Sequence, residues 1–158
     1  MNTPIRVLFV CAGNICRSPM AEAVFRSMVV AADLNERFEI ASVGTGGWHA
    51  GEKPHPGTQA VLQRYGIPLG DKRAIHLGRS DLATYDYIVA MDEENLRDIH
   101  ALHAPIRGEL RRLLEYAPLG NPLDVPDPYY NGAFEQVYQL VRTGCSALLA
   151  AIRAQRGV

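Results

Sequence analysis

Short apolar runs alternate with amphipathic stretches along the chain. Residues 5–10 are almost continuously branched or aromatic, which is typical of a strand buried on both faces. Apolar and polar positions alternate over residues 38–42, and further apolar runs follow at residues 85–91 and 110–116, the last interrupted by arginines. These segments are the four predicted strands.

Between the predicted strands, the pattern favours helices. One helix is predicted to begin near residues 17–19, with a proline in the tolerated first turn, and another covers about residues 58–65. Asp92 is expected to cap a third helix, with Asn95 at its third position. Apolar residues recur at three- and four-residue steps over residues 134–152, which predicts a long final helix.

This alternation of strands and helices predicts an α/β fold with a parallel sheet. The length suits a single domain over residues 1–158. Two stretches are predicted as loops or turns. Residues 44–57 are rich in Gly, Pro and His, and residues 117–132 are turn-rich and contain several prolines.

The amino-acid composition limits the classes of partner and the cellular compartment that we expect. Sixteen basic and seventeen acidic residues give a net charge of -1, so the chain lacks the positive bias that collects nucleic-acid phosphates. The apolar run at residues 5–10 is too short to span a membrane. Three cysteines, an odd number, argue against a disulfide framework and for a reducing compartment. We expect a cytoplasmic protein without nucleic-acid or membrane partners, with leaderless secretion left open.

Residues 11–18, Cys-Ala-Gly-Asn-Ile-Cys-Arg-Ser, carry the candidate chemistry. They lie between a predicted buried strand and a helix start, so their backbone N–H groups can curl around an anion, and the helix N-terminus adds partial positive charge. A thiol in such a cradle, close to an arginine, ionises readily, and the thiolate is the attacking form. Cys11 is therefore the predicted nucleophile.

Other residues of this loop suit the same chemistry. Arg17 offers a planar fork of donors that matches two phosphate oxygens. Gly13 is expected to let the loop adopt a positive φ, and Ser18 to hydrogen-bond the thiolate or the leaving thiol. A Gly-Lys-Ser/Thr nucleotide loop is excluded because no lysine precedes Lys53, and a four-ligand zinc site would need histidines beside the cysteines. The histidines lack metal-ligand spacing and are expected at the surface or in loops: His49, His55, His76, His100 and His103.

Residues 10–19 and the sequence Asp127-Pro128-Tyr129-Tyr130 resemble the signature loop and the general-acid motif of the low-molecular-weight protein tyrosine phosphatases. Residues 42–49 and 85–92 also fall in family order. The resemblance covers nearly the whole chain. It implies a four-stranded parallel sheet flanked by helices on both faces.

The resemblance also implies hydrolysis of phosphotyrosine in proteins through a phosphocysteine, without a metal or cofactor. Cys11 is implied as the nucleophile and Arg17 as the phosphate ligand. Asp127 is implied to protonate the leaving phenolate and then to activate water. Substrate contacts are implied for the rest of the loop and for three aromatic residues: Ala12, Gly13, Asn14, Ile15, Cys16, Ser18, Trp48, Tyr129 and Tyr130.

Supporting residues are implied as well. The side chain of Asn14 is implied to hold the loop conformation, with Ser42 and Asp92 among the supports. Because Tyr129 and Tyr130 are adjacent, we expect one to wall the pocket and the other to be more exposed.

The chain departs from the family at one supporting position. By spacing back from Asp86, Lys72 occupies the place of a histidine that buttresses the phosphate loop in the family, and His76 lies four residues too late. The sequence leaves the contact of Lys72 open.

Competing functions fit the residues less well. An arsenate reductase would need further cysteines in mid-chain, and none lies between Cys16 and Cys145. Relatives that are protein arginine phosphatases, the main alternative, tend to carry threonine at the position of Ile15 and lack the paired tyrosines. A non-catalytic phosphotyrosine-binding module would not need the general acid Asp127.

The two cysteines other than the nucleophile differ in their expected roles. Cys16 either fills space beneath the loop or, as the resemblance implies, traps oxidised Cys11 as a reversible disulfide. Cys145 falls on the apolar stripe of the predicted final helix and is expected in the core.

Overall fold

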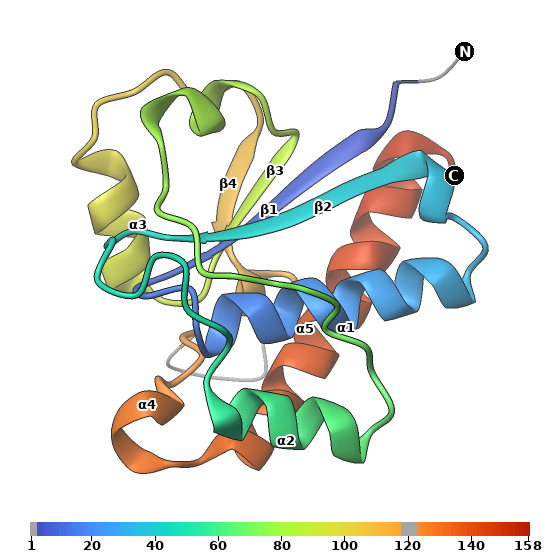
Figure 1. Ribbon diagram of the computed structural model, residues 1–158. Helices are drawn as coiled ribbons and strands as arrows, with labels where there is room; N and C mark the ends of the chain where they lie inside the picture. Colours follow the sequence, from blue (N-terminus) through green and yellow to red (C-terminus); the bar gives the residue numbers. More distant parts are fainter. Residues whose placement is uncertain (1–2, 118–122) are drawn as a thin grey trace.

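Four parallel strands form the sheet of the computed structural model, which describes residues 3–117 and 123–158 (Figure 1). The order across the sheet is β2-β1-β3-β4. The strands are β1 (Ile5–Cys11), β2 (Phe38–Gly44), β3 (Tyr87–Ala90) and β4 (Glu109–Arg112). The predicted four-stranded parallel sheet is therefore confirmed.

Helices connect and cover the strands. They are α1 (Arg17–Ala31), α2 (Pro56–Arg64), α3 (Glu93–His100), α4 (Pro128–Asn131) and α5 (Phe134–Arg156), with 3₁₀ helices at Asn35–Arg37, Arg79–Ala83 and Leu113–Glu115. Among the described residues, no helix combines the length and the apolarity that crossing a membrane requires.

The helices flank the sheet on both faces, as predicted. Helices α1, α2 and α5 lie on one face, and α3 lies on the other (Figure 1). In β1, Val7 and Phe9 belong to the apolar cluster shared with α1 and α5, whereas Leu8 and Val10 belong to the cluster on the α3 side. All four side chains are fully buried. This two-sided burial explains why the strand reads as a continuous apolar run.

The strand order creates a crevice at one edge of the sheet. The chain passes from β1 to β2 on one side and then crosses to β3 on the other side of β1. At such a reversal the connections diverge beyond the carboxyl ends of the strands, and ligands of open α/β sheets bind there. The candidate loop, residues 11–18, follows β1 at this point.

Some predicted boundaries differ from the structure; the third strand is Tyr87–Ala90 rather than residues 85–91. The fourth strand is Glu109–Arg112 rather than residues 110–116, because the chain turns into a 3₁₀ helix at Leu113–Glu115 once the pairing of β4 with β3 ends at Arg112. The turn-rich stretch 117–132 contains the short helix α4, and its residues 118–122 lie outside the described residues.

Candidate active site

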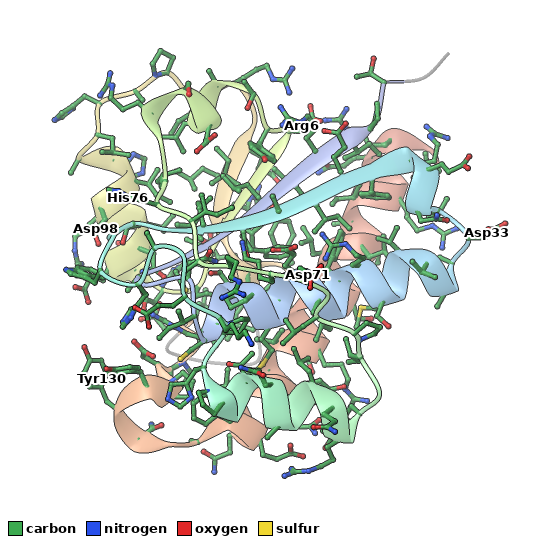
Figure 2. All side chains as sticks on the ribbon, in the orientation of Figure 1. Arg6, Asp33, Asp71, His76, Asp98 and Tyr130 are labelled. Atoms are coloured by element: carbon green, nitrogen blue, oxygen red, sulfur yellow. The ribbon has the colours of Figure 1, made fainter. Side chains whose placement is uncertain are left out.

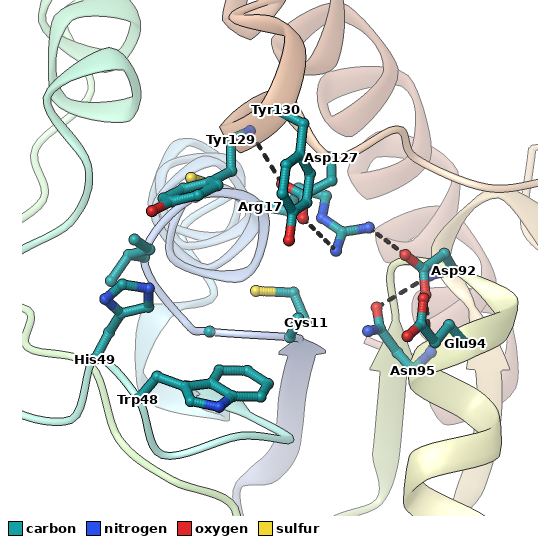
Figure 3. A pocket seen from close by; sticks show the side chains of 14 residues that line it. Cys11, Arg17, Trp48, His49, Asp92, Glu94, Asn95, Asp127, Tyr129 and Tyr130 are labelled. Carbon is teal, nitrogen blue, oxygen red and sulfur yellow. Dashed lines mark hydrogen bonds and ion pairs between the residues drawn. The ribbon is translucent and has the colours of Figure 1, made fainter.

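A pocket of about 570 Å³ opens at the carboxyl ends of β1 and β3 (Figure 3). Four segments that are distant in sequence supply its walls. The lining residues are Cys11, Ala12, Gly13, Ile15, Cys16, Arg17, Trp48, His49, Asp92, Glu94, Asn95, Asp127, Tyr129 and Tyr130. The other three predicted site residues, Asn14, Ser18 and Ser42, lie buried behind this lining.

The backbone of the loop is arranged as an anion cradle. The carbonyl oxygens of Cys11, Ala12 and Ile15 accept hydrogen bonds of 2.8 to 2.9 Å from N–H groups of the 44–57 loop. No hydrogen bond among the described residues is donated by the backbone N–H groups of residues 13–16. Helix α1 then begins without a side-chain cap and without an acidic residue in its first turn. These unbonded donors and the helix dipole favour a bound anion.

Cys11 places its thiol at the floor of the pocket. The residue ends β1 and is 3% exposed. Its Sγ lies 2.9 Å from Oγ of Ser18, which is fully buried in the first turn of α1. A hydroxyl at this distance can donate to a thiolate, as the sequence predicted for Ser18.

Asn14 braces the loop through three hydrogen bonds. Its Nδ2 donates to Oγ of Ser18 at 2.7 Å and to Oγ of Ser42 at 3.0 Å. Its Oδ1 accepts from the backbone N–H of Ile75 at 2.9 Å. Asn14 thereby ties the loop to β2 and to the segment that follows α2, in agreement with the support expected from Ser42.

The left-handed backbone lies at a different residue from the one predicted. Asn14 has φ of 57°, whereas Gly13 does not adopt a positive φ. Asparagine tolerates this conformation better than most residues because its side chain hydrogen-bonds locally. Gly13 is instead constrained by space, since a Cβ there would lie 2.9 Å from Cδ2 of His49.

Arg17 is buried and held by acceptors at one end of its guanidinium. Its Nη1 donates to Oδ2 of Asp92 at 2.5 Å and to the carbonyl oxygen of Val125 at 2.9 Å, and its Nη2 lies 3.5 Å from Oδ2 of Asp127. The buried Nε has no partner among the described residues. Burial alone lowers the pKa of Arg17, but the charges of Cys11, Asp92 and Asp127 outweigh it and raise the pKa.

Asp92 therefore supports a different residue from the one implied. It contacts Arg17 and not Asn14. Its other oxygen, Oδ1, accepts from the backbone N–H of Asn95 at 2.8 Å, and the side-chain oxygen of Asn95 accepts in return from the N–H of Asp92. The predicted cap of the third helix is confirmed, and the cap residue doubles as the anchor of Arg17.

Asp127 lies at the entrance of the pocket (Figure 3). It caps α4, with Oδ1 accepting from the backbone N–H of Tyr129 at 3.1 Å, while Oδ2 faces Arg17. Its side chain is 28% exposed. A carboxyl group so placed can reach a leaving group above the cradle and can also meet water.

Aromatic side chains form the outer walls. Trp48 is 71% exposed and lies across the pocket from Tyr129 and Tyr130 (Figure 3). Both tyrosines line the pocket, and they differ in exposure as expected. Their rings meet edge to face with centroids 5.3 Å apart, and this packing lets both rings flank the opening. Tyr130, at 84%, is the more exposed, and Figure 2 places it at the outer edge of the molecule.

Three residues that the sequence does not predict at the site also line the pocket: His49, Glu94 and Asn95. His49 was expected only as a surface or loop histidine, yet its ring lies over Gly13 and 6.0 Å from the ring of Tyr129. Its position directly after Trp48 was the one available signal.

The remaining cysteines are buried and free. Burial raises the pKa of Cys16 to about 12, and the charges of Cys11 and Asp127 add to the effect. Cys145 is fully buried in α5, as predicted, and burial raises its pKa as well. Neither thiol competes with Cys11 as a nucleophile at neutral pH, because the thiolate is the reactive form.

Comparisons with known proteins agree with this geometry. The family model described as low molecular weight phosphotyrosine protein phosphatase matches residues 6–157. The low molecular weight protein-tyrosine-phosphatase YfkJ of Bacillus subtilis is 46% identical over 96% of this chain and 98% of its own. The YfkJ crystal structure matches with a TM-score of 0.93 and covers 98% of both chains.

Two further relatives extend the comparison. The low molecular weight protein-tyrosine-phosphatase PtpA of Staphylococcus saprophyticus is 43% identical over 92% of both chains. The crystal structure of DARP, a drosophila arginine phosphatase, is 29% identical with a TM-score of 0.87, covering 94% of this chain and 98% of its own. The likeness thus extends over sequence and fold together.

Proposed function

The chain belongs to the low molecular weight phosphotyrosine protein phosphatase family, and we propose that residues 1–158 form one phosphatase domain acting through a phosphocysteine at Cys11. It is an enzyme, a protein tyrosine phosphatase that hydrolyses phosphotyrosine in proteins. What remains to be assigned is the part that each residue of the pocket plays in the reaction.

One observation carries the proposal: the thiol of Cys11 lies beneath unbonded backbone N–H groups and beside a buried arginine whose Nε lacks a partner among the described residues. A phosphate group above Cys11 would accept from these donors with its three non-bridging oxygens. Asp92 and Val125 hold the far end of the Arg17 guanidinium, so its orientation is fixed before substrate arrives.

In the first step, Sγ of Cys11 attacks the phosphorus atom as a thiolate. The S–P bond forms while the bond between phosphorus and the tyrosine oxygen breaks. Asp127, in its protonated form, gives its proton to the departing phenolate oxygen, which contributes a factor of about 10² to 10⁴ to the rate. Arg17 and the N–H groups stabilise the charge on the transferring oxygens.

In the second step, water hydrolyses the phosphocysteine. Asp127, now ionised, removes a proton from the attacking water as the S–P bond breaks. The thiolate of Cys11 leaves, and the hydroxyl of Ser18, 2.9 Å away, can donate to it. Phosphate then dissociates and Asp127 holds a proton again, so one water is consumed per cycle.

The shape of the pocket supports an aryl phosphate as substrate. Cys11 is 3% exposed at the floor, whereas Trp48 and the paired tyrosines stand exposed at the opening. An aromatic ring between phosphate and peptide backbone spans this depth and can pack against the aromatic walls. The short side chain of phosphoserine would leave the walls without a partner.

Phosphoarginine is the second candidate substrate. The fold of this chain resembles that of a drosophila arginine phosphatase with a TM-score of 0.87, so the scaffold is compatible with that chemistry. The general acid Asp127 would then protonate a guanidinium nitrogen instead of a phenolate. Ile15 and the paired tyrosines favour the phenolic substrate.

The test is phosphate release from matched phosphotyrosine, phosphoserine and phosphoarginine peptides. We expect release from phosphotyrosine, loss of activity in Cys11→Ser, and a decrease in kcat of about 10² to 10⁴ in Asp127→Ala. The decrease in Asp127→Ala should be smaller with an aryl ester whose leaving group needs no proton. Preference for phosphoarginine would reassign the substrate, and full activity of Cys11→Ser would contradict the mechanism.

We also place the enzyme in the cytoplasm. Its three cysteines are free, which suits a reducing compartment. A thiol nucleophile likewise needs such surroundings to stay reduced.

A further inference from the structure

Glu94 lines the pocket but has no part in the proposed reaction. It lies in the first turn of α3, is exposed, and extends toward the opening (Figure 3). The other two carboxylates of the lining, Asp92 and Asp127, both pair with Arg17, at 2.5 and 3.5 Å. The side chain of Glu94 forms no ion pair or hydrogen bond with any described residue, including Arg97 three residues along the same helix.

No positive side chain of the pocket offsets the charge of Glu94. Arg17 is the one arginine or lysine among the lining residues, and two other carboxylates already share it. His49 is the other lining residue that can carry a positive charge, and its Nδ1 lies 3.0 Å from Oε2 of Glu52. The carboxylate of Glu94 is therefore available to a cation that the substrate brings.

The stability of α3 alone does not explain this carboxylate. An acidic residue in the first turn of a helix interacts favourably with the helix dipole, and Glu93 supplies the same charge one residue earlier. Glu93 also lies 3.5 Å from Arg112 and outside the lining of the pocket. Of these two neighbouring carboxylates, only that of Glu94 faces the substrate opening.

The peptide on either side of a phosphotyrosine would cross the opening where Glu94 lies. The phosphate is placed above Cys11 at the floor, and the tyrosine ring spans the depth of the pocket. In an extended peptide, successive side chains point to opposite faces, so the residues two positions before and after the phosphotyrosine face the enzyme, about 7 Å along the backbone. A lysine or arginine there is long enough to reach a carboxylate at the rim.

We propose that Glu94 is a specificity-determining residue, which selects phosphotyrosine segments that carry a lysine or arginine two residues from the phosphotyrosine. The inference rests on the proposed function, because that function places the phosphate above Cys11. The ammonium or guanidinium group donates to the carboxylate oxygens of Glu94. The exposed ring of Trp48 at the same opening can also receive a cation on its face. An acidic residue at the same place meets like charge and is disfavoured.

The experiment compares phosphotyrosine peptides that differ at a single position, two residues before or two after the phosphotyrosine. That position holds arginine, glutamine or glutamate. For wild type, at one of the two positions, we expect kcat/KM for the arginine peptide to exceed that for the glutamine peptide by about 3- to 5-fold. The glutamate peptide should be poorer than the glutamine peptide. Because the contact is exposed to solvent, raising NaCl to about 0.5 M should reduce the preference.

Substitutions then assign the preference to one side chain. Glu94→Gln should bring the ratio of kcat/KM for the arginine and glutamine peptides to about 1, and Glu94→Lys should invert the order in favour of glutamate. The matched control is Glu93→Gln, which removes the same charge from the same turn of α3 and should keep the wild-type ratio. Each ratio compares peptides on one enzyme, so a general effect of a variant on catalysis or folding cancels.

Binding to Cys11→Ser separates this inference from the proposed function. The variant lacks the nucleophile, and Trp48, the one tryptophan of the chain, reports peptide binding by its fluorescence. The dissociation constants should follow the same order of peptides, and the order should disappear in Cys11→Ser/Glu94→Gln. Binding in this order without phosphate release by the wild type would refute the proposed function and support the inference. Equal affinities for the three peptides, or a preference that survives Glu94→Gln, would overturn it.

Discussion

The single hydroxyl of Ser18 contacts both Asn14, which holds the loop in place, and the nucleophile Cys11. It accepts from Asn14 at 2.7 Å and lies 2.9 Å from Sγ of Cys11. A hydrogen bond to a charged group contributes about 1.5–3 kcal/mol. We expect Ser18→Ala to lower kcat about 10- to 100-fold by slowing breakdown of the phosphocysteine, which releases the thiolate.

Burst kinetics with an aryl phosphate would check this expectation. The burst amplitude should persist while the steady-state rate falls. Loss of the burst together with a fall in the steady-state rate would show that Ser18 acts in the first step instead.

Cys16 is predicted to protect the nucleophile, as the family resemblance implies. After mild peroxide, the thiol of Cys16 attacks the sulfenic acid of Cys11, the S–S bond forms, the S–O bond breaks and water leaves. Because the pKa of Cys16 is raised to about 12, its thiolate fraction and the rate of this step should rise about tenfold per pH unit around neutrality.

Mass mapping and recovery with a dithiol reductant would test this role. Wild type should regain its activity after peroxide, whereas Cys16→Ser should accumulate irreversibly oxidised Cys11. Equal recovery of the two proteins would assign Cys16 to packing alone.

At the scale of an element, α3 and the phosphate site share the cap residue Asp92. One oxygen caps the helix and the other binds Arg17, so two substitutions can separate the roles. The substitution Asp92→Asn retains a cap acceptor but loses the charge, whereas Asp92→Ala loses both. We expect the two variants to raise KM for an aryl phosphate alike.

Their stabilities should differ. The free energy of unfolding of Asp92→Ala should be lower than that of Asp92→Asn by about 0.5–2 kcal/mol, the usual cost of a lost cap. Urea denaturation measures this difference. Equal stabilities would indicate that the contact with Arg17, and not the cap, dominates at this residue.

The elements that the sequence predicts well are those whose pattern is set by burial. Strand β1 is buried on both faces and α5 carries a long apolar stripe, so both were found from apolar residues alone. Strand β4 lies at the edge of the sheet and contains a single apolar residue, Leu110, so its limits depend on pairing with β3. Helix α4 has four residues, too few to display a period.

The residues of the site also fall into two groups: those that a local motif predicts and those whose position depends on tertiary contacts. The spacing of Cys11 and Arg17 within one loop made their meeting predictable, and the motif at Asp127 supplied the third member. The position of His49 depends on the path of the 44–57 loop, and the backbone of Asn14 depends on bonds to Ser42 and Ile75. Such tertiary contacts leave no local signal in the sequence.

At the scale of the whole molecule, the parallel sheet carries the carboxyl ends of β1 and β3 to one crevice, and the anion site there should couple to global stability. A ligand at 100 times its dissociation constant stabilises the folded state by about 2.7 kcal/mol. We expect inorganic phosphate to raise the free energy of unfolding by this amount, and Arg17→Lys to lose most of the effect. An equal gain from chloride at matched ionic strength would contradict a specific site.

In the proposed mechanism, Cys11 carries the phosphate during turnover. Rapid acid quenching of wild type with an aryl phosphate, followed by mass mapping, tests it directly. We expect a phosphate adduct on the peptide that contains Cys11, formed within the burst phase, absent in Cys11→Ser and accumulating further in Ser18→Ala. Turnover without any adduct on Cys11, or an adduct on another residue, would rule out a phosphocysteine at Cys11.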